Sequence, residues 1–124
     1  MTRATTGAAP ANGTASPGSR TDCVRALNDA MRRGAGGRWM ITAGVEALGA
    51  ARVAEAVAAV RRFDGFDADN DPYGERDFGA FALGGERLFW KIDAYDRSLR
   101  AGSPDPADPA VTVRVLTIML AGEY

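Results

Sequence analysis

Residues 78–93 read FGAFALGGERLFWKID and decide the fold, because two apolar runs flank a Gly-Gly pair. Glycine adopts positive φ without strain, and the tightest hairpin turns need positive φ at their central residues. The segment therefore predicts two antiparallel strands joined by a two-residue turn. Because side chains alternate between the two faces of a strand, the second strand has a core face and a polar face. We expect the core face to consist of Leu88, Trp90 and Ile92.

The residues before the hairpin predict a helix, a short strand and a second helix. The first helix begins at Ser19 or Thr21, either of which can cap it; apolar residues recur at helical spacing after them, and glycines end it. The run RWMIT, residues 38–42, follows these glycines and predicts a strand. Valines spaced among alanines over residues 50–62 predict an amphipathic helix. We expect Phe63 and Phe66 to pack the end of this helix onto the core.

The last element, residues 110–121, fits two structures. Asp108-Pro109 is a helix N-cap followed by proline at the first helical position. Alternating valines after it are instead typical of a strand. We predict a helix, because the cap is explicit. The predicted fold is therefore α+β, with a small three-stranded antiparallel sheet, made of one strand plus the hairpin, packed with about three helices in the order α-β-α-β-β-α.

The length and composition limit the classes of protein that this chain can represent. Its 124 residues have room for one core, with residues 1–19 as a disordered tail rich in Ala, Thr, Gly and Pro and residues 20–124 as a single globular domain. One cysteine and no histidine exclude a disulfide framework, a Cys/His zinc site and a histidine-based triad. No run resembles a membrane span or a signal peptide. We expect a cytoplasmic protein with no membrane contact and no cofactor.

The net charge of −1 conceals an uneven distribution. Residues 1–63 carry nine Arg against four acids, whereas residues 64–108 carry eleven acids against five bases. Six of the acids fall within residues 64–77, and so dense an acidic segment can dock on an arginine-rich surface. The candidate protein-binding residues are Asp64, Asp67, Asp69, Asp71, Glu75 and Asp77.

The acidic segment has two other interpretations. Asp67, Asp69 and Asp71 alternate as the first ligands of an EF-hand calcium loop do. However, Pro72 and Phe78 stand where that loop needs its glycine and its bidentate glutamate, so we expect no metal site. Asp and Asn side chains also cap their own backbone in turns, and the sequence Asp-Pro-Tyr-Gly is typical of such turns.

A second polar cluster follows from the alternation on the second strand of the hairpin. If the strand continues past its core residues, the polar side chains of that strand share one face. A lysine beside carboxylates most often forms a structural ion pair, although the face could also bind a ligand. This polar hairpin face consists of Lys91, Asp93, Tyr95 and Asp96.

Two nucleic-acid functions are alternatives to protein binding. A small metal-dependent nuclease would combine Asp77, Glu86 and Lys91 around magnesium, but four residues separate the glutamate from the lysine where the expected motif has one. A DNA-binding accessory protein would use a basic face near the first helix, but the slightly negative net charge argues against direct nucleic-acid contact. The basic residues concerned are Arg25, Arg32, Arg33 and Arg38.

Several short motifs are specific enough to indicate a family. They are NDPYG and DFG before and in the first hairpin strand, FWKID in the second, GSPDPADP before the last element, and RVLTIML and EY at the end. Together, over residues 21–124, they resemble the bacterial family catalogued as domain of unknown function 3768. Similar sequences have His and Tyr where this chain has Arg76 and Ala94, so any role of those side chains does not transfer. The family has no assigned activity.

The resemblance implies a setting. Proteins of this kind are small bacterial proteins, often encoded on plasmids or other mobile elements beside anti-restriction genes, which implies an accessory protein. Together with the acidic segment, this favours a non-enzymatic protein-binding protein, an anti-defence inhibitor of a CRISPR or restriction effector. We expect binding rather than catalysis and assign no catalytic residue. The oligomeric state is not indicated by the sequence.

Overall fold

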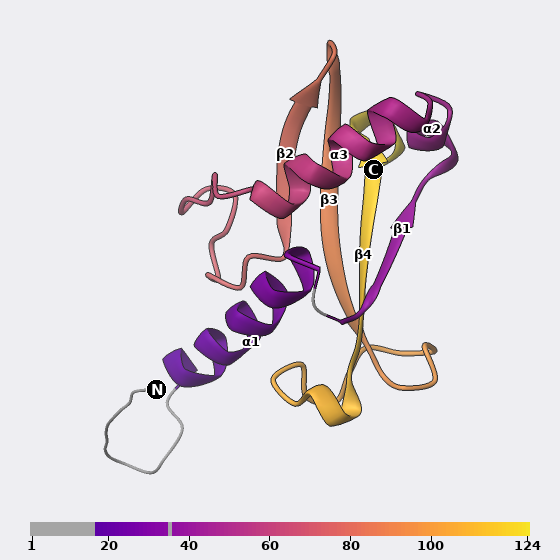
Figure 1. The fold of residues 1–124 in the computed structure, drawn as a ribbon. Coiled ribbons are helices and arrows are strands. Elements are labelled where there is room, and N and C mark those ends of the chain that lie inside the picture. The colour runs from indigo at the N-terminus through magenta and orange to yellow at the C-terminus, as the bar shows by residue number, and fades with distance from the viewer. Residues whose placement is uncertain (1–16, 35) are drawn as a thin grey trace.

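The computed structural model describes residues 17–34 and 36–124, so the tail predicted at residues 1–19 lies outside the described part except for residues 17–19, which belong to the first helix. The first helix starts a few residues earlier than its apolar spacing indicates. Figure 1 shows the helices and strands in chain order. They are α1 (Pro17–Arg32), β1 (Arg38–Ile41), α2 (Ala43–Glu46), α3 (Ala50–Arg62), β2 (Phe78–Leu83), β3 (Glu86–Tyr95) and β4 (Val113–Leu120), with 3-10 turns at Pro109–Val111 and Ala121–Glu123.

The four strands form one mixed sheet in the order β1-β4-β3-β2. β1 runs parallel to β4, and the other two pairs are antiparallel. The prediction of a three-stranded antiparallel sheet was therefore wrong, because a strand stands where the last helix was predicted and pairs with β1 in parallel. The hairpin is confirmed: Gly84 and Gly85 have φ values of 57° and 86° between β2 and β3.

The surroundings of β4 explain this error. Asp108 does cap a turn, since its carboxylate accepts a hydrogen bond from the Ala110 amide at 2.9 Å, but that turn ends at Val111. β4 then lies between β1 and β3, and both of its faces are buried, with Val115 on one and Leu116 on the other. A strand buried on both faces has a nearly continuous apolar sequence. Such a sequence also contains residues at helical spacing.

One face of the sheet carries the core. Leu88, Trp90 and Ile92 on β3 are 0, 0 and 7% exposed, which confirms the predicted core face. Each lies opposite an apolar residue of β4. Figure 1 shows α3 crossing the strands on this face. Phe63 and Phe66, which follow α3, pack against the same cluster as predicted.

Gly79 on β2 lets the indole of Trp90 lie across the strand. The two residues are partners in the β2–β3 ladder. A Cβ atom at position 79 would lie 2.7 Å from the ring of Phe63 and closer still to Nε1 of Trp90. The rings of Phe63 and Trp90 meet edge to face, with their centroids 5.5 Å apart. Glycine is therefore required here by the space that two packed aromatic rings occupy.

We expect Gly79→Val to lower the free energy of unfolding by about 1–3 kcal/mol, because both rings must move in a closely packed core. Urea denaturation followed by tryptophan fluorescence measures the change. Ala82→Val is the matched control, since Ala82 is exposed on the same strand; it should change the stability by less than about 0.5 kcal/mol. Equal stability of the two variants would contradict this account of the packing.

Candidate functional site

The acidic loop, residues 64–77, connects α3 to β2 and is closed by its own side chains. The Asp67 carboxylate accepts hydrogen bonds from the amides of Asp69 and Asn70, both at 2.9 Å. The Asn70 side chain accepts one from the Asp67 amide at 3.0 Å. Asp71 accepts one, also at 3.0 Å, from the backbone amide five residues later. The interpretation of this segment as capped turns is therefore confirmed.

Helix α1 holds the acidic loop from one side. The guanidinium of Arg25 donates a hydrogen bond to the carbonyl oxygen of Gly74. The side-chain amide of Asn28 donates one to the carbonyl oxygen of Glu75 at 2.9 Å. Both bonds go to the loop backbone, so the course of the loop is set by α1 as well as by the caps of the loop itself.

A buried ion pair joins α1, the loop and the sheet, and we call it the Asp29 junction. The Asp29 carboxylate accepts hydrogen bonds from Arg32 of α1 at 2.7 Å and from Arg76 of the loop at 3.0 Å. Arg32 is 1% exposed, and its guanidinium carbon lies 5.3 Å from the ring centroid of Phe66 and 5.7 Å from that of Trp90. The Arg76 guanidinium lies 5.2 Å from the Phe66 centroid. One carboxylate therefore neutralises two guanidinium groups that pack on aromatic rings.

We expect Asp29→Ala to cost about 3–5 kcal/mol, because it leaves the Arg32 charge buried without its partner. Asp22→Ala is the matched control on the same helix: Asp22 pairs with Arg25 at 2.9 Å, but its side chain is 67% exposed. Exposed pairs contribute about 0–1 kcal/mol. Urea denaturation of both variants measures the difference. Similar small losses would show that Arg32 does not depend on Asp29.

The remaining carboxylates of the acidic loop fall into two groups. Asp64 and Asp69 are exposed, and their carboxylates make no hydrogen bond or ion pair with the described residues. Glu75 and Asp77 are half-buried just before β2. Burial is the main cause that raises the pKa of each above its ordinary value of 4.5 or 3.8, and neighbouring carboxylates raise it further.

The raised pKa values of Glu75 and Asp77 predict how the stability of the protein changes with pH. The folded protein binds the protons of Glu75 and Asp77 more tightly than the unfolded chain does, so their stabilising contribution is complete below the ordinary pKa values and is lost as the pH rises through the raised ones. The variant Glu75→Gln/Asp77→Asn should therefore gain stability relative to the wild type as the pH rises from about 3 to about 7. Urea denaturation at a series of pH values measures this difference. A difference that is constant across the series would contradict the raised pKa values.

The structure brings together only part of the polar hairpin face. Lys91 and Asp93 form an ion pair on β3, with the two atoms 3.1 Å apart and both side chains partly exposed. Tyr95 ends the same strand on the same side. Asp96 instead caps the turn that follows, where it accepts hydrogen bonds from the amide and the hydroxyl of Ser98 at 3.1 and 2.8 Å. The hydroxyl bond is the main cause that lowers the pKa of Asp96.

Of the three residues of the nuclease alternative, Glu86 lies far from the other two. Asp77 precedes the first residue of β2, whereas Glu86 opens β3 at the other end of the hairpin. At about 3.4 Å per residue, β2 separates them by about 20 Å. In the described ranges, no three carboxylate, cysteine or histidine side chains are grouped so that they could hold a metal ion. This geometry argues against the acid, acid, lysine set as a magnesium site.

The arginines of the DNA-binding alternative do not form one face. Arg32 is buried in the Asp29 junction, and Arg25 is bonded to the acidic loop. Arg33 and Arg38 are exposed on either side of the turn after α1. Sequence spacing alone had grouped side chains that the fold uses for different contacts.

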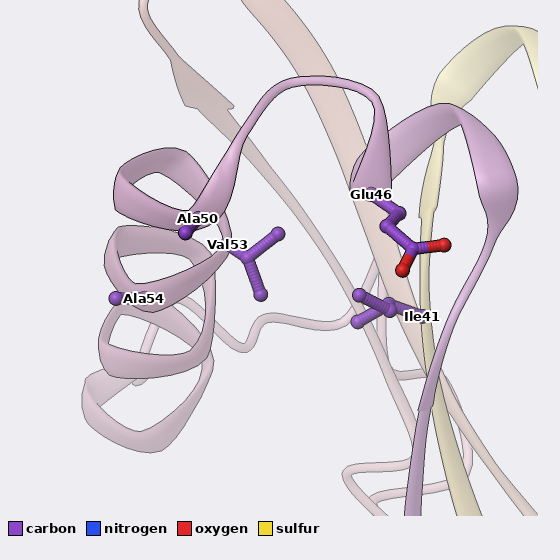
Figure 2. Close-up of a pocket in the computed structure, with 5 residues that line it drawn as sticks. All are labelled: Ile41, Glu46, Ala50, Val53 and Ala54. Carbon is purple, nitrogen blue, oxygen red and sulfur yellow. The ribbon is translucent and has the colours of Figure 1, made fainter.

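A hollow of about 470 Å³ lies between α3 and the edge strand β1 (Figure 2). Ile41 of β1 and Val53 of α3 point toward each other across it, and Glu46 of α2 lies at its rim. Ala50 and Ala54 complete the lining. One carboxylate among four apolar residues can accept an apolar or cationic group but supplies no acid–base pair for catalysis.

Sequence reasoning missed the Asp29 junction. The one local signal was the spacing of Asp29 and Arg32, three residues apart on α1, which lets an acid and a base pair on a helix. Nothing in the pattern indicated that both would be buried, or that Arg76, 47 residues later, would complete the group.

Together, the fold and the loop define a small α+β protein that presents a rigid acidic loop beside the edge of a mixed sheet. A family model described as Protein of unknown function (DUF3768) matches residues 41–123. The chain belongs to this family, which confirms the resemblance. Comparisons with curated proteins and with solved structures give no match. In the part of the chain that the structure describes, no helix combines the length and the apolar character needed to span a membrane.

Proposed function

We propose that this protein is a non-enzymatic binding module of the bacterial cytoplasm whose acidic loop docks on a basic surface of another protein. The observation that carries the proposal is that the loop displays its carboxylates on a backbone held by its own caps and by α1. A loop that is already ordered loses little conformational entropy on binding, so more of the interaction energy appears as affinity.

The charges available to a partner are those that the loop does not use internally. Asp64 and Asp69 are exposed without an intramolecular partner among the described residues. Glu75 and Asp77 add negative charge near the sheet when they ionise. Exposed charges act mainly on the association rate and on specificity, and salt screens them. We therefore expect the complex to form faster and more tightly at low ionic strength.

The partner class that we propose is a protein of a host defence system that binds nucleic acid, such as a CRISPR or restriction effector. An arginine-rich groove that attracts phosphates also attracts a dense set of carboxylates, and an occupied groove no longer accepts nucleic acid. The role as an accessory of a plasmid or other mobile element comes from the resemblance described above. In this role the protein is an anti-defence inhibitor.

Removing the two unused charges should weaken binding without changing the fold. We expect Asp64→Asn/Asp69→Asn to weaken partner binding about 2- to 30-fold, because each exposed charge pair contributes about 0.2–1 kcal/mol. The partner is captured from a host lysate on the immobilised protein, identified by mass spectrometry, purified and titrated at low and high salt. The wild-type affinity should fall as salt rises.

The matched control is Glu55→Gln/Glu86→Gln, which removes one exposed acid from α3 and one from the start of β3, at the end of the hairpin opposite Asp77. It should leave the affinity unchanged. Equal affinity of the loop variant and the wild type at low salt would refute the loop as the binding surface. Magnesium-dependent DNA cleavage by the wild type, lost in Asp77→Asn, would replace the proposal with the nuclease alternative.

A further inference from the structure

The two edges of the sheet differ in how they are protected. β1, at one edge, is four residues long and begins with Arg38. β2, at the other edge, is six residues long and reads FGAFAL, without charge or proline. Natural sheets protect their edges with short strands, charged side chains or proline. β2 has none of these features, so it is the edge to which a further strand can add.

The ladder shows which backbone groups of β2 are open. The Ile92 amide donates to the carbonyl oxygen of Asp77 at 2.8 Å, so odd-numbered residues of β2 bond to β3 and even-numbered residues point outward. Phe78, Ala80 and Ala82 therefore each direct one N–H and one C=O away from the sheet. Within the described part of the chain, no backbone group bonds to these outward atoms. They form a regular row of donors and acceptors along the edge.

The space beside β2 suits a peptide strand. Ala80 and Ala82 have small side chains, which leave room for the side chains of an added strand. In Figure 1, no other described helix or strand runs along the outer side of β2 between its middle and the hairpin turn. The acidic loop ends at Asp77, directly before Phe78, so a negatively charged segment lies at the start of this edge strand.

We propose that β2 takes up an extended peptide segment of a partner protein as a fifth strand, antiparallel to β2. This direction places the C-terminal end of the segment beside Asp77 and the acidic loop. The segment therefore consists of alternating apolar residues followed directly by Arg or Lys, whose charge complements the loop. The expectation that the segment carries basic residues rests on the proposed function. Main-chain hydrogen bonds to β2 supply a second source of affinity that does not depend on charge.

The arrangement around β2 favours a single strand over a second copy of the protein. Figure 1 shows the end of α3 and the acidic loop extending past β2. A second copy paired antiparallel through β2 would place its hairpin turn, with Glu86, beside Asp77 and the acidic loop, where like charges repel. An isolated strand needs room only in the plane of the sheet.

Hydrogen exchange at single amides tests the proposal directly. The probe is the peptide acetyl-Thr-Val-Thr-Val-Thr-Val-Arg-Arg-amide at millimolar concentration, added to the full chain labelled with ¹⁵N. In the free protein, the amides of Phe78, Ala80 and Ala82 should exchange rapidly, and those of Gly79 and Phe81, which face β3, slowly. The probe should slow the first three by on the order of tenfold or more.

A variant pair separates the backbone from the side chain. Ala80→Pro removes one outward N–H and leaves the ladder to β3 intact, and it should weaken probe binding by about tenfold. Ala80→Val keeps the N–H and should bind the probe as the wild type does. Slow exchange at the Phe81 amide in both variants checks that the hairpin is formed. If a variant fails to fold, hydrogen exchange of the wild type with and without the probe still tests strand addition.

The remaining outcomes separate this proposal from the proposed function. Unchanged exchange at Ala80 with saturating probe overturns strand addition, even if the probe shifts the resonances of Asp64 and Asp69, which would support charge recognition alone. Equal protection by a probe ending in Glu-Glu supports strand addition and refutes charge recognition. Protection of β2 that rises with protein concentration without a probe identifies a second copy as the occupant and overturns the proposal.

Discussion

The burial of one carboxylate, that of Asp29, between two arginines is the constraint on which the rest of the structure depends. A buried guanidinium is strongly unfavourable without a partner, so Arg32 can pack on Trp90 and Phe66 only while Asp29 accepts its hydrogen bond. The same carboxylate takes Arg76 from the acidic loop. Asp29 thereby contacts both α1 and the segment that returns to β2, and it adds to the bonds that Arg25 and Asn28 make with the loop backbone.

The acidic loop shows how a fold accommodates like charges that repel one another. The carboxylates of Asp67 and Asp71 accept hydrogen bonds from backbone amides, and their negative charge strengthens those bonds. Glu75 and Asp77 are partly withdrawn from water, and their raised pKa values register the cost of holding them there as anions. Asp64 and Asp69 are exposed to solvent. The acids that hold the loop backbone are therefore different from those that stay exposed for the proposed binding.

The features that the sequence predicts correctly are those that neighbouring residues decide. The Gly-Gly turn, the core side of β3 and the caps of the acidic loop each depend on residues a few positions apart, and each is confirmed. β4 has a local cap, but its partners lie far along the chain, and burial on both faces removes the alternation that identifies a strand. Asp96 was placed on a binding face, although Ser98 beside it makes it a turn cap. No pattern of residues specifies which protein a surface binds, so the partner stays a proposal.

The parallel pairing of β1 with β4 has a consequence for the order in which the chain folds. Arg38 lies opposite Val115, so this pair closes across most of the chain, and closing so long a loop is entropically slow. β1 has β4 as its one neighbour in the sheet, and β4 in turn links it to the hairpin. During synthesis β1, α3 and the hairpin are all made before β4. Their apolar faces therefore stay uncovered until β4 pairs with them, and the core closes late, after Leu120 has been added to the chain.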